Sequence, residues 1–205
     1  AIITAITLVA GNITAVYQNS FKRMMAYSSI SHAGYLLIGL ASLGTNTKQA
    51  IVFYSLAYSV ATIAAFGVLL LVAQQRSTQT ITSEGVVTEN FDSFNGLARQ
   101  NPLLGIAMTV SMLSLAGIPL TAGFWGKFYM FSTAVERGQI WLLVVAVLMS
   151  AVGIYYYFRV IIAMYFRDGG NDPIQVAPFY RYVLVAATIL TLGLGIAPGL
   201  LEGLF

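Results

Sequence analysis

The sequence contains no cysteine and only one histidine. Without cysteine the chain cannot form a disulfide, bind a metal through thiolates or use a cysteine nucleophile. One histidine and seven carboxylates leave little material for a metal cluster. The sequence also has no phosphate-binding loop, nucleophile triad or metal-ligand spacing. We therefore expect no flavin, iron–sulfur cluster, nicotinamide or metal site in this chain.

Charge is scarce as well. Charged residues make up 8% of the chain and hydrophobic residues 58%, whereas soluble domains carry about 25% charged residues. A lipid-facing surface is apolar, so a bilayer explains this composition better than a very apolar soluble helical domain does. The net charge of +3 rests on few residues in the connections, so we expect no nucleic-acid partner. The composition predicts an all-α integral membrane protein.

The apolar stretches predict about six transmembrane helices, since a span needs about 20 apolar residues. The chain opens on Ala1 inside an apolar segment with no basic region before it, and we expect a C-terminal fragment whose earlier helices are missing. We treat residues 1–205 as a single transmembrane domain with an extramembrane connection at 74–101, which holds a short interfacial helix near 94–99. The predicted spans are 1–17, 21–42, 50–73, 102–133, 139–166 and 179–204.

The fourth span is too long for one straight helix. Residues 102–133 would reach about 48 Å as a helix, well past the roughly 30 Å apolar core. Gly117-Ile118-Pro119 interrupts the run, and proline removes a helical hydrogen bond. We predict a helix broken near 117–119, with irregular backbone facing protein or water. A plain proline kink is the alternative.

The basic residues indicate the orientation. Seven lie in or beside the connections after spans one, three and five, and two lie in the even connections. The odd connections are therefore predicted to face the cytoplasm or matrix. The seven are Lys22, Arg23, Arg76, Arg99, Arg159, Arg167 and Arg181, and the two are Lys48 and Arg137.

Lys127 is the most informative residue, because it lies eight residues past Pro119 in an apolar run. A charge at membrane depth costs at least about 2.5–3.5 kcal/mol. Burial favours the neutral amine, which would let this lysine exchange protons. The alternative is a lysine that extends its amine to the far interface. A buried lysine beside a broken helix is typical of a hydrated transport path.

Lys22 and His32 belong to the second span. Ser29 follows Lys22 by seven residues and precedes His32 by three, so helical spacing predicts one polar strip. We interpret Lys22 and His32 as proton-relay candidates that face the bundle interior, on one buried polar layer with Lys127. Lys22 could instead be a cytoplasmic flanking charge, and His32 could only hydrogen-bond and pack.

Residues 155–159, Tyr-Tyr-Tyr-Phe-Arg, lie toward the cytoplasmic end of the fifth span. Aromatic side chains gather at membrane interfaces, and a nearby arginine can reach the headgroups. We interpret this run as an interfacial aromatic belt.

Two motifs resemble one known family. Residues 19–35, NSFKRMMAYSSISHAGY, and residues 116–128, AGIPLTAGFWGKF, are similar to hallmarks of the antiporter-like subunits of proton-pumping NADH:quinone oxidoreductase (respiratory complex I) and Mrp-type cation/proton antiporters. The resemblance covers essentially the whole chain. It is nearest to the subunit N branch, the homologues of mitochondrial subunit 2. Subunit M typically carries glutamate at Lys127, and subunit L tends to carry glutamine at His32.

The resemblance implies a fold and a function. The fragment would be the second five-helix repeat of an antiporter-like fold plus a final helix. Lys127 would be the proton-channel lysine of the broken helix, with Lys22 and His32 on the polar axis of the membrane arm. The function implied is proton translocation by a non-redox subunit of the oxidoreductase. Expected partners are neighbouring membrane subunits, lipid, protons and internal water, in a bacterial inner membrane rather than a mitochondrial one. A stand-alone Mrp-type antiporter and a structural scaffold are the alternatives.

Overall fold

A computed structural model describes residues 1–44, 46–79, 90–169 and 174–200. The described chain is helical, with one isolated bridge between Ser20 and Asn90. In chain order the elements are α1 (Ile2–Val16), α2 (Phe21–Ala41), α3 (Thr47–Gln79), the 3-10 helix η1 (Phe91–Phe94), α4 (Leu97–Gln100), α5 (Pro102–Ala116), α6 (Ala122–Glu136), α7 (Ile140–Phe166) and α8 (Pro178–Ile196).

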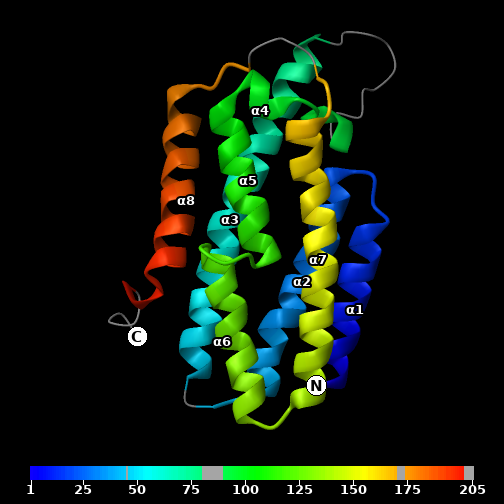
Figure 1. The fold of residues 1–205 in the computed structure, drawn as a ribbon, viewed down its shortest axis with the longest axis vertical. Coiled ribbons are helices and arrows are strands. Elements are labelled where there is room, and N and C mark those ends of the chain that lie inside the picture. The colour runs from blue at the N-terminus through cyan, green and yellow to red at the C-terminus, as the bar shows by residue number, and fades with distance from the viewer. Residues whose placement is uncertain (45, 80–89, 170–173, 201–205) are drawn as a thin grey trace.

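The long helices form an upright bundle (Figure 1). α5 stands above α6 in the view, and α3 packs along both of them. α1 packs on α2 and α7 at one edge, whereas α8 packs on α3, α5 and α6 at the other edge. The short elements η1 and α4 lie at the end of the bundle where α3 and α7 finish.

Three helices of the described chain are long and apolar enough to cross a membrane, namely residues 47–75 of α3, α7 and α8. α1 and α5 are apolar but shorter. α2 spans 21 residues, but serines and His32 dilute its apolar character. α5 and α6 have 15 residues each, about 22 Å at 1.5 Å per residue, so neither crosses the apolar core alone.

Local sequence sets the ends of α5. The Asn101 side chain accepts a hydrogen bond from the Leu104 backbone N–H at 3.3 Å, and Pro102 occupies the first turn, both typical of a helix start. At the other end Gly117 adopts the left-handed conformation, with φ of 83°. The Ile118 N–H then bonds to the Leu113 oxygen at 3.0 Å, which is a glycine-terminated helix end.

The helix break predicted at residues 117–119 is present, between α5 and α6. Two local hydrogen bonds satisfy polar groups of the break: the Ser114 hydroxyl accepts from the Gly123 N–H at 3.1 Å, and the Thr121 hydroxyl donates to the Ile118 oxygen at 2.7 Å. That the irregular backbone of the break faces protein or water rather than lipid stays a prediction. Leu120 has a positive φ of 73°, and its side chain is 69% exposed.

Two other boundaries differ from the predicted ones. α3 remains helical to Gln79, so the connection expected from residue 74 begins later, and residues 80–89 lie outside the described chain. α8 ends at Ile196 rather than near 204, because Pro198 disfavours helical backbone at the residue before it. A short helix near 94–99 was expected, and η1 and α4 occupy that region.

Candidate functional site

Lys127 is buried in the second turn of α6, with a relative exposure of 5%. Its Nζ donates to the Ala116 backbone oxygen at 2.8 Å and to the Ser150 hydroxyl at 2.9 Å. The same nitrogen lies 5.0 Å from the centre of the Tyr35 ring. The amine therefore points into the bundle, and the alternative that it extends to an interface is wrong.

The break creates the binding place for this amine. Ala116 is the last residue of α5, and the carbonyls at a helix C-terminus carry partial negative charge and attract cations. Gly117 also leaves room for the lysine, because a Cβ there would lie 2.8 Å from the Lys127 Cδ. The C-terminal carbonyl of α5 and the absence of a side chain at Gly117 together make room for the Lys127 ammonium.

His32 is buried on α2 and uses both ring nitrogens. Nδ1 lies 2.6 Å from the Tyr54 hydroxyl of α3, and Nε2 lies 3.0 Å from the Tyr157 hydroxyl of α7. A neutral imidazole has one N–H donor and one acceptor nitrogen. One tyrosine therefore donates to the ring while the other accepts from it, and the two roles exchange when the tautomer changes.

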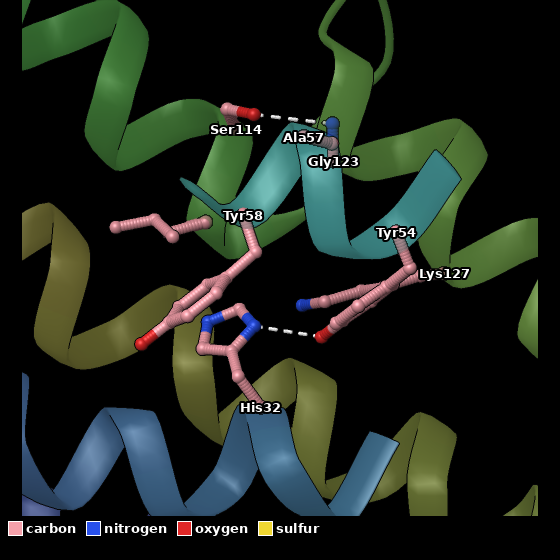
Figure 2. A pocket seen from close by; sticks show the side chains of 8 residues that line it. His32, Tyr54, Ala57, Tyr58, Ser114, Gly123 and Lys127 are labelled. Atoms are coloured by element: carbon pink, nitrogen blue, oxygen red, sulfur yellow. Dashed lines mark hydrogen bonds between the residues drawn. The ribbon is translucent and has the colours of Figure 1, made fainter. Parts of the chain in front are cut away.

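Lys127 and His32 line one small cavity (Figure 2). In the view both side chains reach into the space beside the Tyr54 hydroxyl, and Tyr58 closes another side. The cavity volume is about 10 Å³, which is enough for about one water molecule. The other lining residues are Ala57, Ser114, Leu115 and Gly123.

Lys22 does not join this cavity. It is the second residue of α2 and is exposed, so the expectation that it faces the bundle interior is wrong for this chain. Lys22 and Ser29 share a face, as their spacing predicts, but that face is the exposed one. The buried polar face of α2 consists instead of Ser28, Ser31 and His32.

The tyrosines of α7 are not one interfacial belt. Tyr155 is 59% exposed, but Tyr156 and Tyr157 are each only 1% exposed. The Tyr156 hydroxyl donates to the Asn12 side-chain oxygen at 3.0 Å, and the Tyr157 hydroxyl bonds to Ser28.

A sequence signal for this burial exists. Gly153, Tyr157, Val160 and Met164 recur at helical spacing and are all buried. Tyr157 also lies nine residues before the end of α7, about 14 Å along the helix, which is deeper than an interfacial position.

None of the acidic side chains that the structure describes lies at the site. Within the part of the chain that the structure describes, the carboxylates are Asp92, Glu136 and Asp168, and all three are exposed. The same residues contain no group of three histidine, cysteine, aspartate or glutamate side chains that could hold a metal. The arrangement can therefore store and move a proton among an amine, an imidazole and hydroxyls.

The family profile described as NADH:quinone oxidoreductase/Mrp antiporter, transmembrane, matches residues 1–153. The chain belongs to this family. Among curated members, it is 43% identical to NADH-quinone oxidoreductase subunit N of Trichlorobacter lovleyi, covering 99% of this chain and 39% of that protein. It is 40% identical to subunit N 2 of Herpetosiphon aurantiacus, covering 99% and 36% respectively.

Solved structures of this antiporter-like family have the same fold. A chain of respiratory complex I from Thermus thermophilus with bound aureothin superposes with a TM-score of 0.81 at 39% identity, over 98% of this chain and 43% of that one. A chain of the Mrp complex from Dietzia gives a TM-score of 0.79 at 21% identity, over 98% and 44%, which supports the fold alone.

The chain thus spans less than half the length of the curated relatives it matches. It is a membrane-spanning member of the antiporter-like family, and its relatives belong to multi-subunit complexes.

Proposed function

We propose that this chain is the proton-carrying second half of a subunit N of a proton-translocating NADH:quinone oxidoreductase. The observation that carries the proposal is the shared cavity of Lys127 and His32. Two basic groups that face one water-sized space, with no carboxylate beside them among the described residues, are suited to passing a proton rather than to forming a fixed ion pair.

The geometry suggests a switch at Lys127. In its charged form the ammonium is held by the Ala116 oxygen and the Ser150 hydroxyl. After the proton leaves, the neutral amine loses its attraction to the negative end of α5 and is ready to accept another proton. Loading and unloading thus follow the local electrostatic balance, which other subunits would shift when they release redox energy.

The transfer itself would pass through the cavity. The Lys127 ammonium gives a proton to a water in the cavity, and that water gives one to His32 directly or through Tyr54. A water and a hydroxyl can each accept a proton on one side and release one on the other. Lys127 and His32 are therefore the proposed proton-transfer residues, whereas exposed Lys22 lies outside this step.

The proposed architecture has six membrane crossings, with α5 and α6 together making the fourth. They comprise the second five-helix repeat of an antiporter-like fold and a final helix, within one transmembrane domain. The end with η1 and α4 faces the cytoplasm, since most basic connections lie there. We place the subunit in a bacterial inner membrane, beside neighbouring membrane subunits and lipid, with the redox cofactors of the complex in other chains.

The test is Lys127→Met in the complete complex in membrane vesicles, with Lys48→Met as the control. Lys48 is an exposed lysine at the second position of α3. We expect Lys127→Met to lower proton pumping and coupled quinone reduction by at least roughly tenfold, while the subunit still assembles. Lys48→Met is expected to match the wild type.

Three results would change the assignment. Wild-type pumping in an assembled Lys127→Met complex would reject the proton-carrying role and favour a structural scaffold. Cation transport that depends on sodium and persists without the other complex I subunits would favour a stand-alone antiporter. A loss of activity in Lys48→Met equal to that in Lys127→Met would remove the specific role of the buried lysine.

A further inference from the structure

We propose that Tyr157 of α7 is a proton relay that continues the path beyond His32, away from the Lys127 cavity. The inference rests on the proposed proton translocation and adds a residue to it. The proposal rests on two tyrosines, Tyr54 and Tyr157, that hydrogen-bond to opposite nitrogens of the buried His32 ring. Of these two, Tyr54 lines the cavity with Lys127 and Tyr157 does not.

His32 therefore has a polar group on each side of its ring. On its Nδ1 side lie Tyr54, the water-sized cavity and Lys127. On its Nε2 side lies the Tyr157 hydroxyl, which is not among the groups lining that cavity. A proton that reaches one nitrogen can leave from the other, so the imidazole connects the two sides without rotating.

Beyond Tyr157 lies a cluster of buried polar side chains. The Tyr157 hydroxyl bonds to Ser28, and the neighbouring Tyr156 ring lies 4.5 Å away between centres. Tyr156 in turn donates to Asn12 on α1. Ser28 precedes His32 by one helical turn toward the start of α2, so the cluster extends toward the end of the bundle that carries η1 and α4.

The step conserves protons and charge. His32 receives a proton on Nδ1 from the cavity side and releases the proton on Nε2 to the Tyr157 oxygen. Tyr157 gives its own hydroxyl proton to the Ser28 oxygen, and Ser28 releases its hydroxyl proton to a water beyond it. Afterwards each hydroxyl again carries one proton, the imidazole is neutral in the other tautomer, and one proton has moved from the cavity side to the Ser28 side.

Packing alone does not explain these hydroxyls. Phenylalanine would fill the same volume in an apolar helix, whereas a buried hydroxyl is unfavourable unless it is hydrogen-bonded. Asn12 accepts from Tyr156 but carries no hydroxyl that could exchange a proton. We therefore assign Tyr157 as the relay, and Tyr156 with Asn12 as positioning residues that hold it.

The run Tyr155-Tyr156-Tyr157 provides a matched control for the test. Tyr157→Phe and Tyr155→Phe each remove one hydroxyl, from a buried and an exposed residue respectively. In the complete complex we expect Tyr157→Phe to slow pumping roughly tenfold and to raise the ratio of rates in H₂O and D₂O, because proton transfer becomes limiting. Tyr155→Phe is expected to change neither. A structural role for Tyr157 would leave the isotope ratio unchanged.

The outcomes separate the two proposals. If Lys127→Met abolishes pumping while Tyr157→Phe retains wild-type rates and isotope ratio, the relay is rejected and the proposed function stands. If Lys127→Met pumps normally, the proposed function fails whatever Tyr157→Phe does. If Tyr157→Phe does not assemble, Ser28→Ala with Tyr156→Phe removes the hydroxyls beyond Tyr157. Wild-type pumping and isotope ratio in that variant would overturn the relay.

Discussion

The Nζ of Lys127 lies 2.8 Å from the backbone oxygen of Ala116, the last residue of α5. The bond joins two half-helices across the break, because Lys127 belongs to α6. A helix that ends at membrane depth presents carbonyls without helical partners, and here one of them receives a side-chain ammonium. The break and the lysine are thus parts of one site.

Arginine is not expected to replace Lys127. Lys127→Arg keeps the positive charge but holds its proton at all accessible pH values, and its planar guanidinium differs in shape from the ammonium that the Ala116 oxygen and the Ser150 hydroxyl bind. We expect assembly with pumping reduced at least roughly tenfold, measured in vesicles at matched subunit content. Pumping close to that of the wild type would show that charge alone, without proton release, is sufficient.

Gly117→Ala is expected to impair both stability and pumping. Alanine at positive φ costs about 1–2 kcal/mol, and its Cβ would lie 2.8 Å from the Lys127 Cδ. Gly138→Ala is the matched control, because Gly138 also has positive φ, at 67°, and its Cβ would meet nothing within 4 Å. Equal pumping in the two variants would show that the contact with Lys127 has no functional effect.

Gly195→Ala is expected to disturb the contact of α8 with the break. The added Cβ would lie 2.2 Å from the Leu120 oxygen, and the Trp125 indole N–H donates to the Gly195 oxygen at 2.8 Å. We expect a loss of about 1–3 kcal/mol, seen as a lower unfolding temperature of the detergent-solubilised complex. Gly193→Ala meets nothing within 4 Å and is expected to be neutral or to stabilise by up to about 1 kcal/mol.

Filling the cavity is expected to slow transfer. Ala57 lines the space between His32 and Lys127, and Ala57→Val adds two methyl groups to a void that holds about one water. We expect slower pumping with little loss of assembly. Ala57→Ser, which adds a small polar group, serves as the control. Unchanged pumping in Ala57→Val would indicate that no water is needed between the two bases.

Arg159 is expected to stabilise more than an exposed ion pair does. Its guanidinium donates to the Val16 oxygen at 2.8 Å and lies 4.5 Å from the centre of the Phe91 ring. A charged donor of this kind contributes about 1.5–3 kcal/mol. Arg99 pairs with Asp168 at 3.5 Å on an exposed surface, worth about 0–1 kcal/mol. Thermal unfolding of Arg159→Ala and Arg99→Ala compares them, and an equal loss would contradict the ranking.

The sequence predicted the features that depend on local chemistry. A glycine and a proline in an overlong apolar run interrupt the helix whatever its neighbours are. A lysine eight residues later lies inside the apolar run, where a charged side chain is expected to face the protein interior. Both the break and the buried amine of Lys127 therefore follow from the order of residues along one short segment.

The sequence could not predict in the same way which face of a helix is buried by neighbouring helices. The polar residues of α2 lie on more than one face, and only contacts with α3 and α7 distinguish buried His32 from exposed Lys22. Tyr155 and Tyr157 have the same chemistry and nearly the same depth, yet they point in different directions. Tertiary packing decides such cases, and a single sequence carries that information only through the spacing of its buried neighbours.

The exposed positions of all the described carboxylates give the Lys127 site an electrical property. A lysine paired with an acid forms a dipole, so its protonation alters the field only nearby. No described carboxylate lies beside Lys127, so each proton adds positive charge inside the described bundle. Moving one elementary charge across the full membrane involves about 2.3 kcal/mol per 100 mV, so a step from mid-depth to either surface involves a fraction of that. The fraction of Lys127 side chains that carry the extra proton would then depend on the transmembrane voltage.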